Sequence, residues 1–388
     1  MKHKINVLAF AILVASINMQ AQSLLWTQVA NPDSLQVNGV AFSTDNSKVL
    51  SGTNCHPSHI RLYDAGNGNI TWDYLVGANL MCQMGVGFSS DGNYFASIEE
   101  LGHVLIFDYS QNPPDSLTTI NMGTNYAFSI SFAPNSLKIA VGGSGGKLQT
   151  YHLPAGSADL SISAHSTYVT AVSYASNNLM IATGGSDDKV KIWDTLGVLK
   201  HILNGHTGDI TSVKFTPDHT KLISSSKDNT LKIWDVLTGS LIKTISVSSA
   251  DVNAFEISHD GDHLVTVSAD SYIRFWNLNT YSLELQFVQD HSGNPICIAW
   301  SSDGNYVATG TSNGLVTLYS VPASLGINDL DLSNLINVYP SPFKEFIRVD
   351  ITKEFIRSVK ITDIHGKVVL YENLSGVQSH AFLNTSGI

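Results

Sequence analysis

The chain has 388 residues, and its composition indicates a β-rich protein without a nucleic-acid partner. Only 14 % of the residues are charged, 30 are glycine, and the net charge at pH 7 is −11. Nucleic-acid-binding proteins need a basic face, so we predict no nucleic-acid partner. Few charges, together with many turn-forming and β-branched residues, favour strands over helices. No apolar run reaches the roughly 20 residues that a bilayer-spanning helix needs, so we predict no membrane span.

The first 21 residues have the pattern of a secretory signal peptide. Lys2 and Lys4 precede the apolar run INVLAFAILVASI, and small Ala21 follows at the expected cleavage position. A basic start, a short apolar core and a small residue at the cut are the features of such peptides. A buried N-terminal strand is the alternative. We therefore predict that residues 1–21 are removed during export across the inner membrane.

The three cysteines do not form a disulfide framework. An odd number of cysteines in an exported chain leaves at least one thiol unpaired. The residues are Cys55, Cys82 and Cys297. We expect stability to come from core packing instead.

One sequence pattern recurs seven times in residues 22–322. Each copy joins an aromatic or apolar residue, an Asp- or Asn-centred turn and a run of small residues, as in AFSTDNSKVLSG and AWSSDGNYVATGT. The anchor residues of successive copies are 41 to 46 positions apart, at Phe42, Phe88, Phe132, Tyr174, Phe215, Ile257 and Trp300. Units of this length have room for four short strands each. The repeat therefore predicts an all-β fold, a seven-bladed β-propeller.

We expect an N-terminal outer strand to close the ring. LLWTQVA, residues 24–30, precedes the first unit, whereas the seventh unit ends at VTLYSV without an outer strand of its own. A strand from the N-terminus that completes the last blade would remove an open sheet edge.

The repeat segment resembles the tryptophan–aspartate (WD) repeat family. Its best unit, GHTGDITSVKFTPDHTKLISSSKDNTLKIWD at residues 205–235, has the family's Gly-His start and Trp-Asp end. The resemblance implies a buried network in which a carboxylate accepts hydrogen bonds and joins neighbouring strands. The implied residues are His165, Thr183, Asp187 and Trp193 in the fourth unit, His206, Ser224, Asp228 and Trp234 in the fifth, and Thr266, Asp270 and Trp276 in the sixth.

The other units depart from this pattern. The sixth has Ser248 in place of His, and the seventh keeps His291 and Thr309 but lacks the Asp and the Trp. The first three units have no Gly-His start. We therefore expect blades 4 and 5 to be the stiffest and blades 1 to 3 the least regular.

A polar linker at residues 323–334 leads to a C-terminal segment, residues 335–388, that no longer follows the repeat. Alternating runs such as FIRVDI and VKITDI, with the turn HGK, predict a small antiparallel β-sandwich. YPSPF at residues 339–343 and the ending LNTSGI resemble the type A C-terminal sorting domain of type IX secretion substrates in Bacteroidetes. The resemblance implies the type IX secretion machinery as a partner and a secreted or cell-surface location. In that family a further strand follows Ser-Gly-Ile, so we expect a truncated sorting domain here.

Turns at one end of blades 1 to 3 form the candidate binding rim. They lie within residues 53–59, 99–103 and 143–147, and the third contains the glycine-rich run VGGSGGK, which we interpret as a hairpin turn. The residues singled out are Cys55, His56, His59, Glu99, Glu100 and His103. Thiolate and imidazole suit zinc, so a metal site and a recognition patch are both alternatives to a plain exposed loop. We favour the plain loop and predict no bound metal and no cofactor.

No catalytic motif appears in the sequence. It contains no nucleophile elbow, no HExxH and no Cys-x-x-Cys. We predict an exported, non-enzymatic scaffold that binds a protein or a surface glycan at the rim of blades 1 to 3. The alternative is a secreted propeller hydrolase or lyase, which would gather carboxylates and histidines at the central channel. A third possibility is an envelope component that helps to assemble the secretion apparatus.

Overall fold

The computed structural model divides the chain into two compact units. One unit is Leu24–Ser320, and the other combines Met1–Ser23 with Val321–Ile388. The structure describes residues 12–14, 23–30, 36–53, 58–76, 83–99, 101–124, 126–289 and 293–322, and the strands at 336–339, 346–351, 358–362, 368–373 and 380–384.

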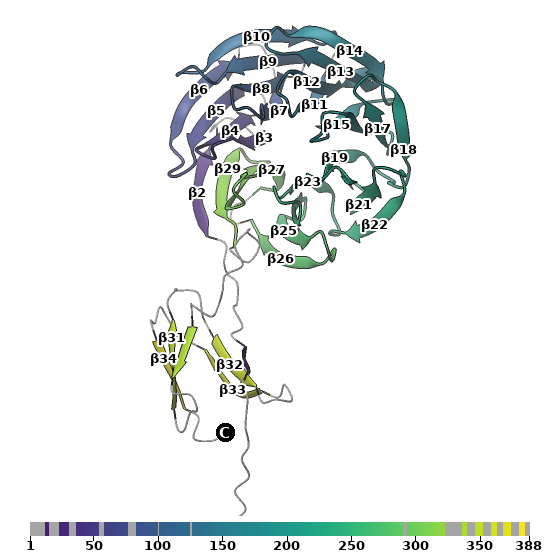
Figure 1. The fold of residues 1–388 in the computed structure, drawn as a ribbon. Coiled ribbons are helices and arrows are strands. Elements are labelled where there is room, and N and C mark those ends of the chain that lie inside the picture. Colours follow the sequence, from purple (N-terminus) through teal and green to yellow (C-terminus); the bar gives the residue numbers. More distant parts are fainter. Residues whose placement is uncertain are drawn as a thin grey trace, which may run out of the picture. The chain divides into compact units, whose positions relative to one another are not determined.

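The larger unit is a ring of seven four-stranded antiparallel sheets, as the repeat predicted (Figure 1). In every blade the strand that comes first in the sequence repeat lies nearest the centre of the ring. Blades 1 to 3 consist, from the centre outward, of β3 (Val37–Phe42), β4 (Lys48–Thr53), β5 (Ser58–Asp64) and β6 (Ile70–Val76); β7 (Gln83–Phe88), β8 (Tyr94–Glu99), β9 (His103–Asp108) and β10 (Asp115–Asn121); and β11 (Ala127–Phe132), β12 (Lys138–Gly143), β13 (Lys147–His152) and β14 (Ser157–Ser163). A 3-10 turn, η1 (Ser144–Gly146), connects β12 to β13.

The remaining four blades repeat this order. They consist of β15 (Val169–Tyr174), β16 (Met180–Gly185), β17 (Val190–Asp194) and β18 (Leu199–Leu203); β19 (Ile210–Phe215), β20 (Lys221–Ser226), β21 (Thr230–Asp235) and β22 (Leu241–Ser246); β23 (Val252–Ile257), β24 (His263–Ser268), β25 (Tyr272–Asn277) and β26 (Leu283–Val288); and β27 (Pro295–Trp300), β28 (Tyr306–Thr311), β29 (Leu315–Ser320) and the N-terminal β2 (Leu24–Val29).

The second strand of each blade is buried on both faces. In β4, β12 and β20 every residue after the first is buried, although successive side chains point to opposite faces. This occurs because the blades stack face to face, so that each inner strand has a neighbouring blade on both sides. The outermost strands, such as β14, have alternating exposed residues instead.

The turn between the first and second strands has the same geometry in every blade. One residue in it has a positive φ, and across the seven blades this residue is Asn46, Gly92, Ser136, Asn178, His219, Gly261 or Gly304. The preceding Asp or Asn accepts hydrogen bonds that hold the turn. In blade 2, the Ser89 hydroxyl donates to Asp91 at 2.6 Å, and the Asn93 amide donates to it at 3.1 Å. The Asp- or Asn-centred pattern in the sequence is therefore a four-residue turn that needs left-handed backbone.

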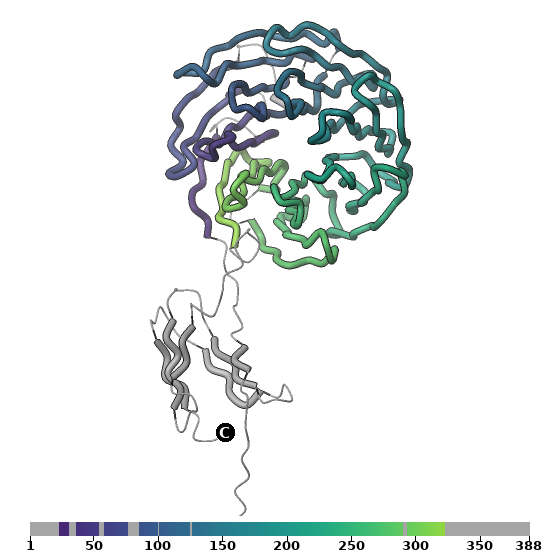
Figure 2. The backbone as a smooth tube through the Cα atoms, in the orientation of Figure 1, coloured from purple at the N-terminus to yellow at the C-terminus, as the bar shows by residue number. Residues whose placement is uncertain are grey.

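The N-terminal strand closes the ring, as predicted. β2 pairs antiparallel with β29, with Leu24 opposite Tyr319 and Val29 opposite Leu315. Figure 2 shows the purple start of the propeller beside its green end. Trp26 of β2 also reaches blade 1, where it stacks on Tyr63 with 5.9 Å between ring centroids and donates from Nε1 to the Ala65 carbonyl at 2.9 Å. One strand therefore completes blade 7 and holds it against blade 1.

Side chains near the channel connect one innermost strand to the next. Each donor lies on one blade, and its backbone acceptor lies on the following blade. The bonds are Thr170 Oγ1 to the Ile210 carbonyl at 2.6 Å, Thr211 Oγ1 to Val252 at 2.7 Å, Asn253 Nδ2 to Pro295 at 2.8 Å, and Cys297 Sγ to Val37 at 3.3 Å. The last bond crosses the closure of the ring, and its buried thiol has a pKa that burial raises to about 12.

The smaller unit contains two three-stranded sheets. One has the order β30–β31–β34, formed by β30 (Ile336–Tyr339), β31 (Phe346–Ile351) and β34 (His380–Asn384). The other has the order β1–β32–β33, formed by β1 (Ile12–Val14), β32 (Ser358–Thr362) and β33 (Val368–Asn373). The rest of the predicted signal peptide and the predicted linker lie outside the described residues, as do the side chains that would pack the two sheets into a sandwich. Among the described residues, no helix is long and apolar enough to span a bilayer.

Removal of residues 22–31 should lower the melting temperature of the propeller sharply, by about 10 °C or more. The deletion opens the edge of β29 and removes the buried Trp26, whose loss alone costs roughly 3–5 kcal/mol by analogy with other buried aromatic residues. Thermal unfolding of chains starting at residue 22 and at residue 32 measures this. Equal melting temperatures would contradict the closure by β2.

Candidate binding surface

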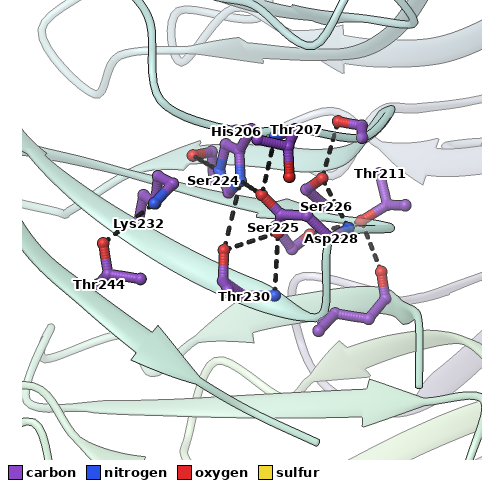
Figure 3. Close-up of polar contacts among 12 residues, drawn as sticks. His206, Thr207, Thr211, Ser224, Ser225, Ser226, Asp228, Thr230, Lys232 and Thr244 are labelled. Carbon is purple, nitrogen blue, oxygen red and sulfur yellow. Dashed lines mark hydrogen bonds and ion pairs between the residues drawn. The ribbon is translucent and has the colours of Figure 1, made fainter. Parts of the chain in front are cut away.

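A chain of hydrogen bonds crosses blade 5 from Trp234 to Asp228, and Figure 3 shows its part around Ser224, His206 and Asp228. Trp234 Nε1 donates to Ser224 Oγ at 2.9 Å, and Ser224 Oγ lies 2.8 Å from His206 Nε2. On the other side of the imidazole, His206 Nδ1 lies 2.8 Å from Asp228 Oδ2. Because an ionised carboxylate can only accept, Nδ1–H donates to Asp228, and Nε2 then accepts from the serine hydroxyl, which itself accepts from the indole. This direction requires a neutral imidazole.

The ionisation of the pair agrees with that direction. Burial lowers the pKa of His206 and outweighs the hydrogen bond with Asp228, which acts to raise it. For Asp228, burial acts to raise the pKa, but hydrogen bonds from Thr230 and His206 outweigh it and lower the pKa. The blade therefore holds a neutral histidine against an ionised carboxylate.

Blade 4 contains the same network. His165 Nδ1 lies 2.7 Å from Asp187 Oδ1, and His165 Nε2 lies 2.8 Å from Thr183 Oγ1. Trp193 Nε1 donates to the same hydroxyl at 3.0 Å. Both histidine side chains are fully buried, so in blades 4 and 5 the implied residues come together inside the sheet and not on a surface.

Blade 6 replaces the missing histidine with an arginine that the sequence analysis did not identify. Trp276 Nε1 still donates to Thr266 Oγ1 at 3.1 Å. Asp270, however, accepts two hydrogen bonds from Arg274, at 3.1 Å and 2.6 Å. Ser248, at the histidine position, donates to the Ala250 carbonyl instead. The sequence did contain a signal for this pair. Arg274 stands where blades 4 and 5 have Lys191 and Lys232, and its unit keeps the network Asp but lacks the His.

Blades 1 and 2 pack aromatic rings against one another. Phe95 and Phe107 stack with 4.7 Å between centroids, and Trp72 meets both rings edge-on. Such ring pairs contribute beyond their buried area. In blade 7, His291 lies outside the described residues, and Thr309 Oγ1 has no hydrogen-bond partner within the described part of the chain.

Three residues of the predicted rim, His59, Glu99 and His103, lie within the described part of the chain. His59 Nδ1 lies 2.6 Å from Asp73 Oδ1, and Arg61 Nη2 donates to the other oxygen of that carboxylate at 2.9 Å. His103 Nδ1 lies 3.7 Å from Glu99 Oε2. Glu99 is only 2 % exposed, which corrects the expectation that its side chain lies on the exposed rim. Cys55, Cys82, His56 and Glu100 lie outside the described residues.

No metal centre is found within the described ranges. They contain no group of three or more His, Cys, Asp or Glu side chains placed to hold an ion. The glycine-rich run at 141–147 forms the β12–β13 hairpin, as interpreted from the sequence.

An aromatic cluster missed by the sequence analysis lies at the same end of the blades as these hairpins, which we call the hairpin end. Tyr126 stacks on Phe128 with 5.8 Å between centroids, and Tyr168 meets Phe128 edge-on at 5.3 Å. Backbone hydrogen bonds join Tyr126 to Ser144 and Tyr168 to Ser186, which fixes both tyrosines beside the hairpins of blades 3 and 4. Tyr168 is 45 % exposed. The two tyrosines occupy the same repeat position, where blades 5 and 6 have Asp209 and Asp251.

A pocket of about 440 Å³ lies at the opposite end, which we call the turn end because the turns between first and second strands lie there. It is lined by the last residues of the innermost strands and the turns that follow, on six of the seven blades. Phe42, Phe88 and Phe132 contribute rings from blades 1 to 3, while Lys214 and Glu256 contribute charges from blades 5 and 6. His259 of blade 6 also lines the pocket.

Comparison with known families identifies both parts of the chain. Residues 157–194, 197–235, 239–277 and 283–320 match the model of the family described as WD domain, G-beta repeat. Each matched range ends with the third strand of a blade, at Asp194, Asp235, Asn277 or Ser320. Residues 337–388 match the model described as Secretion system C-terminal sorting domain. The chain is therefore a seven-bladed propeller that matches the WD-repeat family over residues 157–320 and a secretion sorting domain over residues 337–388.

The sorting domain places the WD-repeat propeller among proteins that are secreted or held at the cell surface through the type IX machinery. No curated protein matches the chain.

The Asp228→Ala variant of the WD-repeat propeller should lose about 2–4 kcal/mol of unfolding free energy, because it leaves His206 and neighbouring donors buried without their acceptor. Chemical denaturation measures the loss. Asp209→Ala is the matched control, because Asp209 forms an exposed ion pair with Lys227, and such pairs contribute little. A loss below about 0.5 kcal/mol at Asp228 would contradict the network.

Acidification should weaken the WD-repeat propeller through its two buried histidines. Burial lowers the folded-state pKa of both His165 and His206, so the unfolded chain binds more protons near their ordinary value of 6.5. Their contribution is present above that value and is lost as the pH falls through it toward the lower folded values. Unfolding free energies at about pH 7.5 and about pH 5.5 should therefore differ less in a His165→Gln/His206→Gln variant than in the native chain. An equal or larger drop in the variant would refute this origin.

Proposed function

We propose that this protein is an exported, non-enzymatic scaffold that binds another protein, or a surface glycan, at the hairpin end of blades 2 to 4. The carrying observation is the cluster of Tyr126, Phe128 and Tyr168. Tyrosine combines a large rigid apolar ring with a polar tip, and such rings are enriched among the residues that dominate binding energy. A protein partner is the first candidate, because an aromatic cluster beside several hairpins suits an extended interface.

The neighbouring hairpins add contact surface around this cluster. Gly145, in the hairpin of blade 3, has a φ of +68°, and no atom lies within 4 Å of the place that a Cβ would take there, so the loop tip leaves open space. Leu101, in the hairpin of blade 2, is 52 % exposed. These hairpins belong to blades that depart from the repeat consensus, and they extend the contact surface beyond Tyr168 of blade 4.

Export and surface delivery belong to the same proposal. Cleavage after Ala21 would remove β1 and leave a mature chain whose first strand is β2. The two C-terminal sheets would then form the sandwich of the sorting domain and address the propeller to the type IX machinery. An acidic molecule of net charge −11 would favour a basic or neutral partner at the cell surface.

The enzymatic alternative finds less support. A hydrolase or lyase at the channel needs titratable groups that converge on the axis. In the channel pocket, Glu256 is already paired with Lys214 at 2.6 Å, and His259 is the remaining titratable residue of the lining. The same loops could also contact the secretion apparatus itself, which is the remaining candidate role.

The test compares two double variants that remove exposed apolar side chains from opposite ends of the propeller. Tyr126→Ser/Tyr168→Ser alters the hairpin end, and Leu196→Ser/Leu237→Ser, which replaces side chains 82 % and 88 % exposed, alters the turn end. Each purified protein is used to capture partners from the envelope and medium of the native bacterium, and partner affinity is then measured directly.

The tyrosine variant should bind the captured partner at least about tenfold more weakly, and the leucine variant should bind it like the native chain. Native affinity in the tyrosine variant, or a loss confined to the leucine variant, would overturn the proposed surface.

A further inference from the structure

We propose that the channel pocket at the turn end binds a free α-amino acid with an apolar side chain. This site lies at the opposite end of the propeller from the proposed partner surface and does not depend on it. The inference rests on the pairing of one charged wall with one aromatic wall in a single pocket.

The charged wall presents one cation and one anion side by side. Lys214 Nζ lies 2.6 Å from Glu256 Oε2, and the two residues come from adjacent innermost strands, β19 and β23. The pair is only partly covered, with the Lys214 side chain 37 % exposed and the Glu256 side chain 20 % exposed. An ammonium group has three donors, and a carboxylate has several acceptor positions, so each partner can take a further ligand group.

The spacing of the pair selects a zwitterion whose charges are adjacent. In a free α-amino acid the ammonium and the carboxylate are attached to the same carbon, so both can face the pair at once. In a peptide the two ends are separated by at least one trans peptide unit, about 3.8 Å between Cα atoms, and cannot both reach it as closely. A ligand with a single charge would be attracted by one member of the pair and repelled by the other.

The aromatic wall selects an apolar side chain. Phe42, Phe88 and Phe132 line the pocket from blades 1 to 3, and all three residues are partly accessible. Val40, Val86 and Ile130 extend the same wall. A cavity of about 440 Å³ falls within the size of known small-ligand sites and can hold one such amino acid with bound water.

The other polar residues of the lining include Asn46 and His259, together with several hydroxyls, of which those of Ser43 and Ser301 are committed to the turns. The Ser43 and Ser301 hydroxyls donate to Asp45 and Asp303, each at 2.6 Å. These carboxylates are therefore occupied, and the pocket-lining pair of Lys214 and Glu256 carries the charge recognition.

Titration calorimetry with L-phenylalanine and L-leucine tests the site on the mature chain. We expect saturable binding of one molecule per chain in the micromolar to millimolar range. N-acetyl-phenylalanine, phenylalanine amide and the dipeptide of two phenylalanines should each bind at least about tenfold more weakly, because each loses one of the two adjacent charges or separates them.

Variants locate the site. Lys214→Met and Glu256→Gln should each weaken phenylalanine binding at least about tenfold, and Lys227→Met, which breaks an exposed ion pair on the same blade, should change it less than about twofold. Thermal unfolding shows whether each variant is folded. If a variant does not fold, the comparison of phenylalanine with its derivatives on the native chain still tests the proposal.

Absence of binding by both amino acids at about 10 mM would overturn the proposal, since such an affinity is too weak for a functional site. Equal binding of the N-acetyl or amide derivative would overturn the zwitterion assignment. Unchanged binding by Lys214→Met would place the ligand elsewhere.

Discussion

The structure depends on one constraint, which is that no blade can bury both of its faces alone. The inner strands of each sheet are apolar on both sides, so each blade needs a neighbour on either side, and a row of such blades is complete only when it closes into a ring. The closing contact is the pairing of β2 with β29, reinforced by Trp26 against Tyr63. Because these segments lie at the two ends of the propeller sequence, the ring cannot close until the whole propeller segment is present.

Different blade pairs meet this constraint with different chemistry. Blades 4 and 5 use a buried chain of hydrogen bonds that ends in Asp187 or Asp228, blade 6 substitutes the Arg274–Asp270 pair, and blades 1 and 2 rely on stacked aromatic rings. Loss of the Gly-His start therefore does not imply loss of packing. In blades 1 to 3, which lack this start, the hairpin sequences also differ from the repeat consensus. The proposed binding surface lies beside these hairpins.

The sequence predicted the architecture because a period of about 43 residues reports on a unit that is repeated in space. It also predicted the closure by β2, since the seventh unit lacked an outer strand. The candidate site was harder to predict from the sequence. The burial of Glu99 depends on packing between blades, and the cluster of Tyr126 and Tyr168 depends on which repeat positions of adjacent blades meet at the hairpin end. The pocket around Lys214 and Glu256 is lined by residues from six blades, so no local sequence pattern predicts it.

Hydrogen exchange of the native protein tests the closed ring most directly. If β2 completes blade 7, the paired amides of β2 and β29 should be protected to the same degree as those of the outer strand pairs of blades 4 and 5, because all of them open only when the ring opens. Fast exchange confined to β2 and β29, with the other blades still protected, would show that the last blade is not closed and would contradict the account.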